Sequence, residues 1–318
     1  MKRTLHAYAV LASLVGTPAF GQAPAAPAAV PVVPNMANIM AVPADAPPPH
    51  TARRGAYKVE IVADPGLPGF TIIRPAGNRG KARPFPVLAW GNGGCFFDNT
   101  DARPFLSTIA SNGIVVIAPG PLNPPVPAKP DAPLGERFGY YKGTALKTAL
   151  DWVEKQSANK AGAYYHRLDP TRMAVSGYSC GGLQAIENAA DSRVKSVVIV
   201  SSGTFPKGMV LENAAATKES IARIHSPTAY LIGGPADVAY PNAEDDYARF
   251  PAVPVFKGNI NAGHGNTMHH PGGGWFAEAA SAWLLWTLNG DKAAARYFKG
   301  SDCTLCKQPV WKIERKGL

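Results

Sequence analysis

The sequence has few charged residues, only four cysteines and no long apolar run. Charged side chains make up 17% of the 318 residues, against roughly 25% in an average globular protein, which excludes charge-rich disorder and a coiled coil. A membrane-spanning helix needs about 20 consecutive apolar residues, and the chain has no such run. It also lacks the interleaved aromatic and basic residues of nucleic-acid-binding motifs. We therefore expect neither membrane insertion nor a nucleic-acid partner.

Acidic residues are outnumbered by basic ones, 22 to 32, which gives a formal net charge of +10. Several of the cations gather near the C-terminus, at Lys307, Lys312, Arg315 and Lys316. Such a group either binds an anionic surface or polymer, or is an ordinary solvated basic surface. The sequence favours the second interpretation, because no motif accompanies the charges.

The first 21 residues have the pattern of a cleaved signal peptide. A charged start is followed by an uncharged, mostly apolar run from Leu5 to Val15 and then by small residues that suit a cleavage site. Residues 22–52 hold 8 of the 31 prolines and have too few large apolar side chains to build a core, so we expect a tail or linker. Residues 53–318 suffice for one domain. The mature protein is thus expected to be secreted or periplasmic.

Short apolar runs alternate with helical patterns along the domain. The expected strands are Tyr57–Ala63, Phe70–Arg74, Val87–Trp90, Ile114–Ala118, Met173–Gly177, Val194–Val200, Thr228–Ile232 and Val253–Asn259. The expected helices are Pro104–Ser111, Thr144–Gln156, Gly181–Ala190 and Ala277–Leu288. From Val87 onward the strands are continuous apolar runs, which is typical of a sheet covered on both faces. The pattern predicts an α/β fold with a doubly wound, mainly parallel sheet flanked by helices.

The strongest chemical signal is the segment Gly177-Tyr178-Ser179-Cys180-Gly181, which lies between an expected strand and an expected helix. In this context it resembles the G-x-S-x-G nucleophile elbow of the α/β-hydrolase superfamily. Glycines two before and two after the serine allow a tight turn at which neighbouring chains approach closely. We therefore predict that Ser179 is a nucleophile; the alternative is a serine that only caps the following helix.

A nucleophilic serine needs a base and an acid that orients the base, and in this fold they follow in the order Ser, Asp or Glu, His. Asp237 lies just past the strand that ends at Ile232, where a loop can aim its carboxylate at the site. Asp245 and Asp246 are the alternatives, but they fall in what looks like the next helix. We predict Asp237 as the acid.

The expected base is His264, which follows the last expected strand and has a glycine on either side. Those glycines let the loop bend. His269 and His270 are the alternatives, in a Gly- and Pro-rich stretch where we expect surface or rim residues. Together, Ser179, Asp237 and His264 form the predicted catalytic triad.

With these residues in order, residues 57–306 resemble the dienelactone-hydrolase-like and cutinase-like branch of the α/β hydrolases. The run from Ala282 to Asp291, followed by Arg296-Tyr297-Phe298, is similar to the terminal segment of cutinase-type polyester hydrolases. The resemblance implies a serine carboxylic ester hydrolase without a metal or other cofactor. The chain departs from those polyester hydrolases at three positions, Cys95, Tyr178 and Cys180, where they usually carry other residues.

The resemblance also implies which backbone amides hold the oxyanion of the tetrahedral intermediate. These are the amide of Cys180, after the nucleophile, and that of Cys95, with Gly94 as the alternative. Two amides that each reach one oxygen at about 2.9 Å lie no more than roughly 6 Å apart, near the Cα spacing of a disulfide. We therefore expect a Cys95–Cys180 disulfide that braces the oxyanion hole; two buried thiols are the alternative.

The remaining cysteines, Cys303 and Cys306, form a C-x-x-C pair without a second such pair to complete a zinc site. In an oxidising compartment we expect a local disulfide. Four cysteines allow three pairings, however, and spacing alone does not choose among them.

Only about 27 residues, Ser201 to Pro227, separate the expected sixth and seventh strands. This is too short for a large lid, so the cleft is expected to be open to bulky or polymeric esters. Phe96, Phe97, Tyr178 and Trp275 are candidates for its apolar, substrate-binding walls. Two other functions remain open: a peptidase or amidase of the same fold, and a non-catalytic binding protein on a hydrolase scaffold.

Overall fold

The computed structural model describes residues 39–77, 83–126, 132–209 and 211–318, all of which belong to one unit, 35–318. The expected signal peptide, 1–21, and residues 22–38 of the expected tail lie outside the described residues. Within the described ranges, no helix is long and apolar enough to cross a lipid bilayer.

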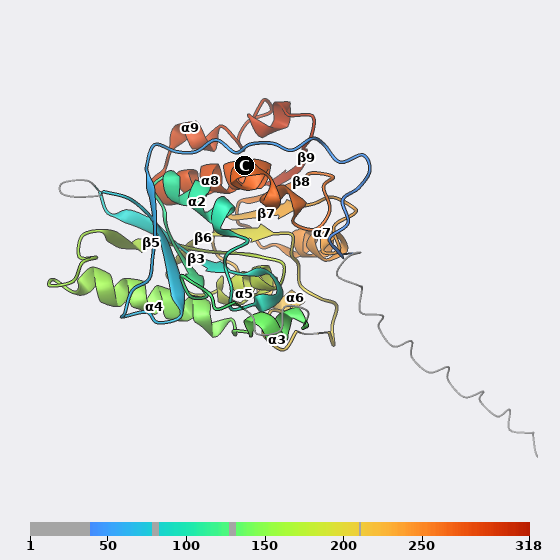
Figure 1. Ribbon diagram of the computed structural model, residues 1–318. Coiled ribbons are helices and arrows are strands. Elements are labelled where there is room, and N and C mark those ends of the chain that lie inside the picture. Colours follow the sequence, from blue (N-terminus) through green and yellow to red (C-terminus); the bar gives the residue numbers. More distant parts are fainter. Residues whose placement is uncertain (1–38, 78–82, 127–131, 210) are drawn as a thin grey trace, which may run out of the picture. The chain divides into compact units, whose positions relative to one another are not determined.

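The described strands form one nine-stranded sheet in the order β1-β2-β4-β3-β5-β6-β7-β8-β9 (Figure 1). The strands are β1 Val59–Val62, β2 Phe70–Pro75, β3 Phe85–Gly91, β4 Val115–Pro119, β5 Leu168–Tyr178, β6 Val194–Val200, β7 Thr228–Ile232, β8 Val255–Asn259 and β9 Lys312–Lys316. Neighbouring strands from β4 to β8 pair in parallel, whereas β1–β2, β2–β4 and β8–β9 pair antiparallel. The prediction of an α/β fold with a mainly parallel sheet is confirmed.

Helices cover both faces of this sheet, with α4 and α5 on one face and α2 and α8 on the other (Figure 1). The described α-helices are α2 Arg103–Ser111, α3 Leu134–Phe138, α4 Thr144–Ala158, α5 Cys180–Asn188, α6 Lys218–Ile221, α7 Tyr240–Arg249, α8 Gly274–Asn289 and α9 Lys292–Ala295. Strand β3 shows how the sequence supports two cores: Val87 and Ala89 join the cluster under α4, and Leu88 and Trp90 join the cluster under α8. Successive side chains of a strand point to opposite faces, so a strand buried on both faces is apolar throughout.

The edge strand β9, Lys312–Lys316, was not predicted from the sequence. It pairs antiparallel with β8 and ends the sheet. Two residues of the expected basic group have partners there: Arg315 donates to the carbonyls of Phe298 and Gly300, and Lys316 Nζ donates to the carbonyl of Tyr247. An edge strand with charged side chains is protected from pairing with other chains. The same charges are typical of a solvated tail, which is why the strand was not predicted.

The parallel strands point their carboxyl ends to one edge of the sheet. Strand β3 lies between β4 on one side and β5 on the other. The order in which successive strands are added to the sheet therefore reverses at β3. In open α/β sheets, ligands bind outside the carboxyl ends of the strands at such a reversal. The segments after β3 and β5 are therefore where the fold favours a functional site.

Candidate active site

Ser179 occupies a strained turn between β5 and α5. Its backbone has φ +53° and ψ −120°, a combination that an L-residue adopts only when its surroundings enforce it, at a cost of about 1–3 kcal/mol. The flanking glycines permit the turn: a Cβ on Gly177 would overlap the carbonyl of Gly181, and a Cβ on Gly181 would overlap that of Gly91. The backbone thus has the elbow geometry that the sequence predicts, with the Ser179 hydroxyl at the carboxyl edge of the sheet.

The structure brings the three predicted triad residues into direct contact. His264 Nε2 lies 3.0 Å from Ser179 Oγ, and His264 Nδ1 lies 2.7 Å from Asp237 Oδ1. The three side chains come from the segments after β5, β7 and β8, whose carboxyl ends lie at one edge of the sheet. An alcohol, an imidazole and a carboxylate in this order are what is needed to remove the proton of the alcohol.

Asp237 is buried, with 1% of its surface exposed, yet it is held as a carboxylate. Burial by itself raises its pKa, but the hydrogen bond and charge of His264 and the amides of Ala239 and Gly233 outweigh burial and leave the pKa below its usual value. A carboxylate accepts the Nδ1 proton of His264, which leaves Nε2 as the acceptor facing Ser179. The geometry therefore selects the imidazole tautomer that a general base requires.

The two alternative acids have other partners. Asp246 is fully buried and accepts hydrogen bonds from the Thr204 amide and hydroxyl, from Tyr230 and from Lys218. Asp245 pairs with Lys218 and Arg249 at the surface. In both cases the carboxylate is satisfied within or next to α7, away from the imidazole.

The two alternative bases are also placed elsewhere. His269 is exposed, and His270 Nδ1 accepts a long hydrogen bond from the His50 amide at 3.4 Å. Burial and the neighbouring His50 and His269 lower the pKa of His270. Both histidines lie in the segment after His264, where the sequence predicts surface or rim residues.

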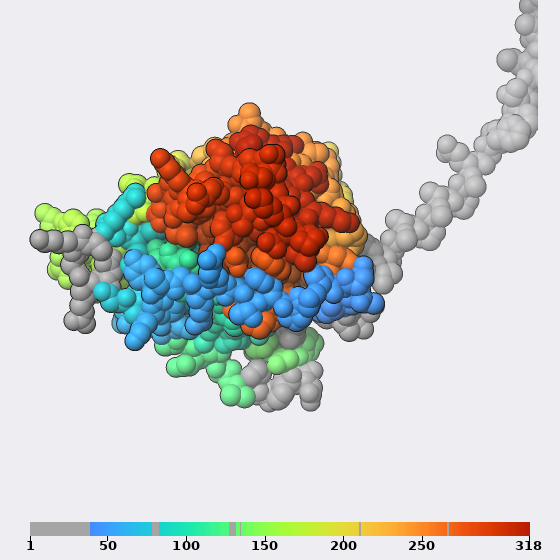
Figure 2. Space-filling model, turned by 90° about the horizontal axis from the view of Figure 1, so that it is seen from above, coloured from blue at the N-terminus to red at the C-terminus, as the bar shows by residue number. Residues whose placement is uncertain are grey.

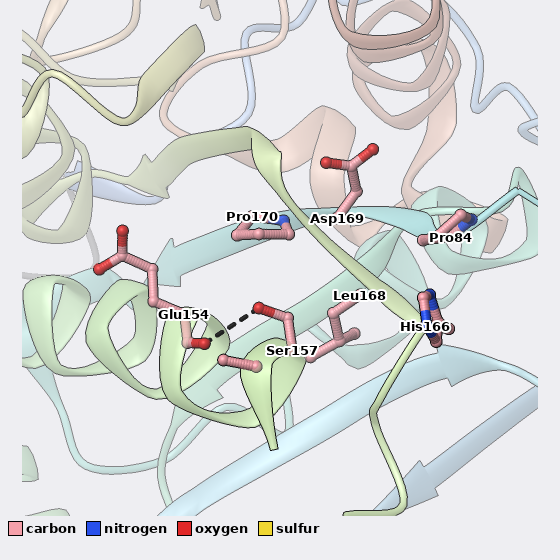
Figure 3. Close-up of a pocket in the computed structure, with 8 residues that line it drawn as sticks. Pro84, Glu154, Ser157, His166, Leu168, Asp169 and Pro170 are labelled. Carbon is pink, nitrogen blue, oxygen red and sulfur yellow. Dashed lines mark hydrogen bonds between the residues drawn. The ribbon is translucent and has the colours of Figure 1, made fainter. Parts of the chain in front are cut away.

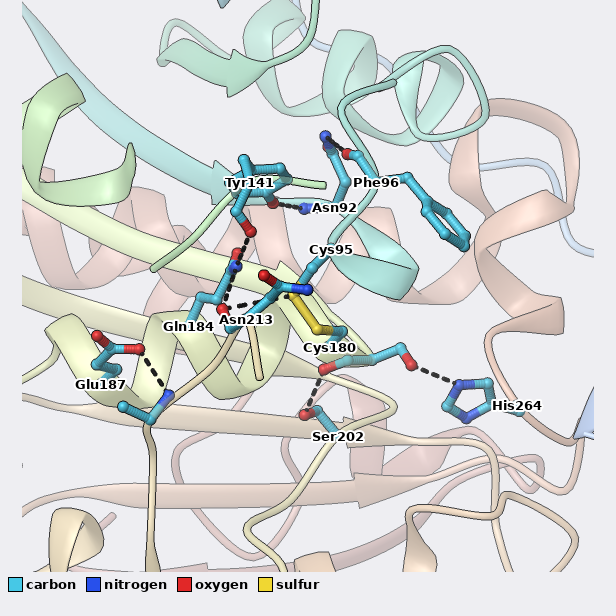
Figure 4. Close-up of a disulfide and its surroundings, with 12 residues drawn as sticks. Asn92, Cys95, Phe96, Tyr141, Cys180, Gln184, Glu187, Ser202, Asn213 and His264 are labelled. Carbon is cyan, nitrogen blue, oxygen red and sulfur yellow. Dashed lines mark hydrogen bonds between the residues drawn. A yellow bond between two sulfur atoms is a disulfide. The ribbon is translucent and has the colours of Figure 1, made fainter. Parts of the chain in front are cut away.

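A disulfide joins Cys95 to Cys180, with their Cα atoms 5.3 Å apart (Figure 4). The spacing matches the limit of roughly 6 Å that follows when two amides share one oxygen. Because Cys180 is the first residue of α5, its amide has no carbonyl partner one turn earlier in the helix. The Cys95 amide instead lies in a 3₁₀ turn and donates to the Asn92 carbonyl at 3.2 Å. The two predicted oxyanion donors are thus neighbours, and the second also makes a long hydrogen bond within its own loop.

Cys95 has the unusual backbone angle φ +53°, directly after Gly94 at +61°. Two hydrogen bonds from outside the loop hold this conformation: the Tyr141 amide donates to the Cys95 carbonyl at 3.1 Å, and the Asn92 amide donates to the Tyr141 hydroxyl at 2.5 Å. Burial raises the pKa of Tyr141, so its hydroxyl stays neutral. Tyr141 was not predicted from the sequence, because no local motif marks it.

The side chain of Gln184 extends this network from α5. Its Nε2 donates to the carbonyls of Tyr141 and Asn213, at 3.2 and 2.9 Å (Figure 4). The segment after β6 is thereby linked to the loop that carries Cys95. The loop 92–96 is therefore fixed by the disulfide on one side and by a buried hydrogen-bond network on the other.

The four predicted aromatic wall residues have different surroundings. The ring of Tyr178 lies 5.2 Å from that of His264, and its hydroxyl donates to the His264 carbonyl. Phe96, the residue after Cys95, forms a partly exposed aromatic cluster with Phe138 and Tyr140. Tyr178 thus contacts His264, whereas Phe96 contacts the aromatic rings of Phe138 and Tyr140.

The other two predicted wall residues have their contacts elsewhere. The Phe97 ring lies against Gly69 and packs on the core cluster under α4. Trp275, at the start of α8, stacks on the His50 ring with centroids 3.6 Å apart. Neither pairing involves a residue of the triad.

Residues 39–52, part of the expected tail or linker, lie along the domain as an N-terminal strap, within the blue band of Figure 2. Met40 Sδ lies 3.7 Å from the Tyr178 hydroxyl oxygen, and Asp45 Oδ1 accepts from Asn261 at 2.9 Å. His50 stacks on Trp275, and its Nε2 lies 3.1 Å from a carboxylate oxygen of Glu278. The strap thereby contacts the elbow and both ends of the segment that carries His264.

A pocket of about 500 Å³ opens at the opposite edge of the sheet, at the amino ends of β3 and β5 (Figure 3). It is lined by Pro84, Glu154, Ser157, Ala158, His166, Leu168, Asp169 and Pro170. Its two carboxylates already have partners, Glu154 with Arg193 and Asp169 with Arg172. None of the predicted site residues faces this pocket.

The other predicted disulfide, Cys303–Cys306, is also present. Among the described residues, no group of three or more His, Cys, Asp or Glu side chains is arranged to hold a metal ion. Comparison of the chain with protein-family models and with curated proteins found no match.

Proposed function

We propose that this protein is a secreted serine carboxylic ester hydrolase of the α/β-hydrolase superfamily. One observation carries the proposal: the continuous contact of Ser179 Oγ, His264 Nε2 and Nδ1, and Asp237 Oδ1, at 3.0 and 2.7 Å. The strained elbow at Ser179 supports it, since such strain concentrates at functional sites.

The mechanism begins when Ser179 Oγ attacks the ester carbonyl carbon while its proton moves to His264 Nε2. Asp237 stabilises the resulting imidazolium through its hydrogen bond to Nδ1. The carbonyl oxygen becomes an oxyanion, which the amides of Cys180 and Cys95 bind. The imidazolium then gives its proton to the leaving alkoxide, and the C–O bond breaks to leave an acyl-enzyme and a free alcohol.

Water completes the cycle by the same steps in the second half-reaction. His264 takes a proton from the water as it attacks the acyl carbonyl, and returns that proton to Ser179 Oγ as the acid is released. Every proton transfer in this cycle passes between Ser179 Oγ, His264 Nε2 and the bound water or alcohol. The restored hydroxyl is again within 3.0 Å of Nε2.

The surroundings of Ser179 favour bulky or polymeric esters. The segment between β6 and β7 has one short described helix, α6, so no large lid is built there. Large apolar side chains are exposed in the strap and in segments after strand carboxyl ends: Val42, Tyr140, Met209, Leu211 and Val238. Exposed apolar side chains of this kind suit contact with an apolar substrate.

Labelling with a fluorophosphonate tests the proposal. The intact protein is expected to form one covalent adduct, on Ser179, because only an activated serine attacks the phosphorus. Peptide mapping by mass spectrometry locates the adduct, and the Ser179→Ala variant is the matched negative control. The absence of an adduct on Ser179 would rule out this function and also a peptidase or amidase, leaving a binding protein.

A panel of substrates then separates the enzyme classes. Esters of rising acyl length and one insoluble polyester are expected to be hydrolysed, whereas matched anilides are not, since the amine leaving group is poorer. Faster cleavage of anilides than of esters would instead assign an amidase.

A further inference from the structure

Two buried serines after β6, Ser201 and Ser202, connect the nucleophile to the base. The Ser202 hydroxyl donates to the Ser179 carbonyl at 2.7 Å. The Ser201 hydroxyl oxygen accepts from the amide of Gly265, the residue after His264, at 3.1 Å. Ser201 is 0% and Ser202 3% exposed, so neither side chain is open to substrate. We call these two residues the serine brace.

The backbone of the brace repeats the strain of the elbow on the neighbouring strand. Tyr178 of β5 is the register partner of Val200 of β6, and the next residue on each strand has a positive φ: +53° at Ser179 and +42° at Ser201. Turns of this kind at non-glycine residues persist only when their surroundings enforce them. Because of the turn at Ser201, two consecutive hydroxyls form hydrogen bonds with two different segments, one at Ser179 and one at Gly265.

A buried carboxylate anchors the far end of the same segment. Asp246 accepts from both the amide and the hydroxyl of Thr204, and also from Tyr230 Oη at 3.0 Å and Lys218 Nζ at 2.9 Å. Asp246 is 0% exposed. A fully hydrogen-bonded buried group of this kind rigidifies what it touches. The segment that follows β6 is therefore held at Thr204 as well as at the two serines.

We propose that Ser201 and Ser202 are positioning residues that hold Ser179 and His264 at the separation required for proton transfer. Ser202 fixes the carbonyl of the elbow, and Ser201 fixes the loop next to the imidazole. The proposal rests on the proposed function of Ser179 and His264. It assigns a role to two serines that never touch the substrate.

The expected consequence of losing the brace is a slower chemical step with unchanged substrate binding. Misplacing a reacting group by about 1 Å costs about 10²-fold in rate. Ser202→Ala and Ser201→Ala are therefore each expected to lower kcat on a short p-nitrophenyl ester by about 10- to 100-fold. KM is expected to stay at the wild-type value, because neither side chain contacts substrate.

Ser196→Ala is the matched control. Ser196 lies on β6, the strand that precedes the brace, is 0% exposed, and forms a hydrogen bond of 2.8 Å with the Thr287 hydroxyl. Its replacement removes a buried serine hydrogen bond of the same kind, away from the triad. It is expected to lower Tm about as much as the brace variants do and to leave kcat unchanged, which separates positioning from stability.

Three measurements are compared across these variants: Tm, the kcat and KM of ester hydrolysis, and the second-order rate constant of fluorophosphonate labelling. Slower labelling and lower kcat in the brace variants, with Tm equal to that of Ser196→Ala, is the expected result. Wild-type labelling and kcat in both brace variants would overturn the brace, whereas a wild-type protein that does not label would overturn the proposed function. If Ser202→Ala does not fold, Ser201→Ala alone carries the comparison, because it removes a separate bond.

Discussion

Ser179→Ala and His264→Ala are each expected to lower kcat on a short p-nitrophenyl ester by about 10⁴-fold or more. The reason is that the two groups act as a unit: without Oγ there is no nucleophile, and without Nε2, 3.0 Å away, nothing removes its proton. Asp237→Asn is expected to cost about 10⁴-fold as well, because an amide favours the wrong imidazole tautomer. The double variant Ser179→Ala/His264→Ala is expected to be no slower than either single one.

Residues of the same type nearby provide the controls for these variants. His269→Ala changes an exposed imidazole five residues after the base, and Asp245→Asn changes a surface carboxylate that pairs with Lys218 and Arg249. Both are expected to keep the wild-type kcat. Retained turnover in Ser179→Ala, or a large loss in His269→Ala, would mean that the nucleophile or the base has been assigned wrongly. Steady-state kinetics on protein of verified mass measures all six variants.

The parallel part of the sheet could be predicted because its strands are buried on both faces. Val194–Val200 and Thr228–Ile232 agree with the prediction at both ends. Strand β5 begins at Leu168, five residues before the predicted start. The prediction began later because an aspartate such as Asp169 is typical of a turn. Its carboxylate is in fact paired with Arg172 at 2.7 Å. Strand propensity does not report such an ion pair.

The triad could be predicted because each member leaves a local signal: glycines around Ser179 and His264, and a strand end before Asp237. Tyr141 and the serine brace leave none, because their partners are backbone groups distant in sequence. The strap is a third case. Its Pro- and Ala-rich composition indicates a linker, but single side chains such as Met40 and His50 give it specific contacts. Composition indicates whether a segment can form its own core. It does not indicate whether the segment packs against a core formed by other residues.

Removal of the Cys95–Cys180 disulfide is expected to affect both stability and catalysis. The bond closes a separation of 85 residues, for which chain entropy gives roughly 4–5 kcal/mol in the free energy of unfolding. In Cys95→Ala/Cys180→Ala, only hydrogen bonds such as that from the Tyr141 amide still hold residue 95 at its positive φ, and we expect its amide to shift from the position beside the Cys180 amide. Loss of one oxyanion donor costs about 10²–10³-fold in kcat, and we expect a loss of about this size with little change in KM.

The second disulfide allows the two effects to be separated. Cys303–Cys306 spans only three positions, so the same chain-entropy relation gives roughly 1.5–2 kcal/mol, and Cys303→Ala/Cys306→Ala is expected to keep full kcat. Both double variants are assayed well below their Tm, with folding verified by circular dichroism, so that a lower kcat does not arise from unfolding. A boronic acid that mimics the tetrahedral intermediate provides a second measure: its affinity is expected to fall with kcat in the Cys95/Cys180 variant only. Unchanged kcat and boronate affinity in that variant would mean that the bond stabilises the fold without shaping the oxyanion hole, and that the Tyr141 network alone fixes the loop.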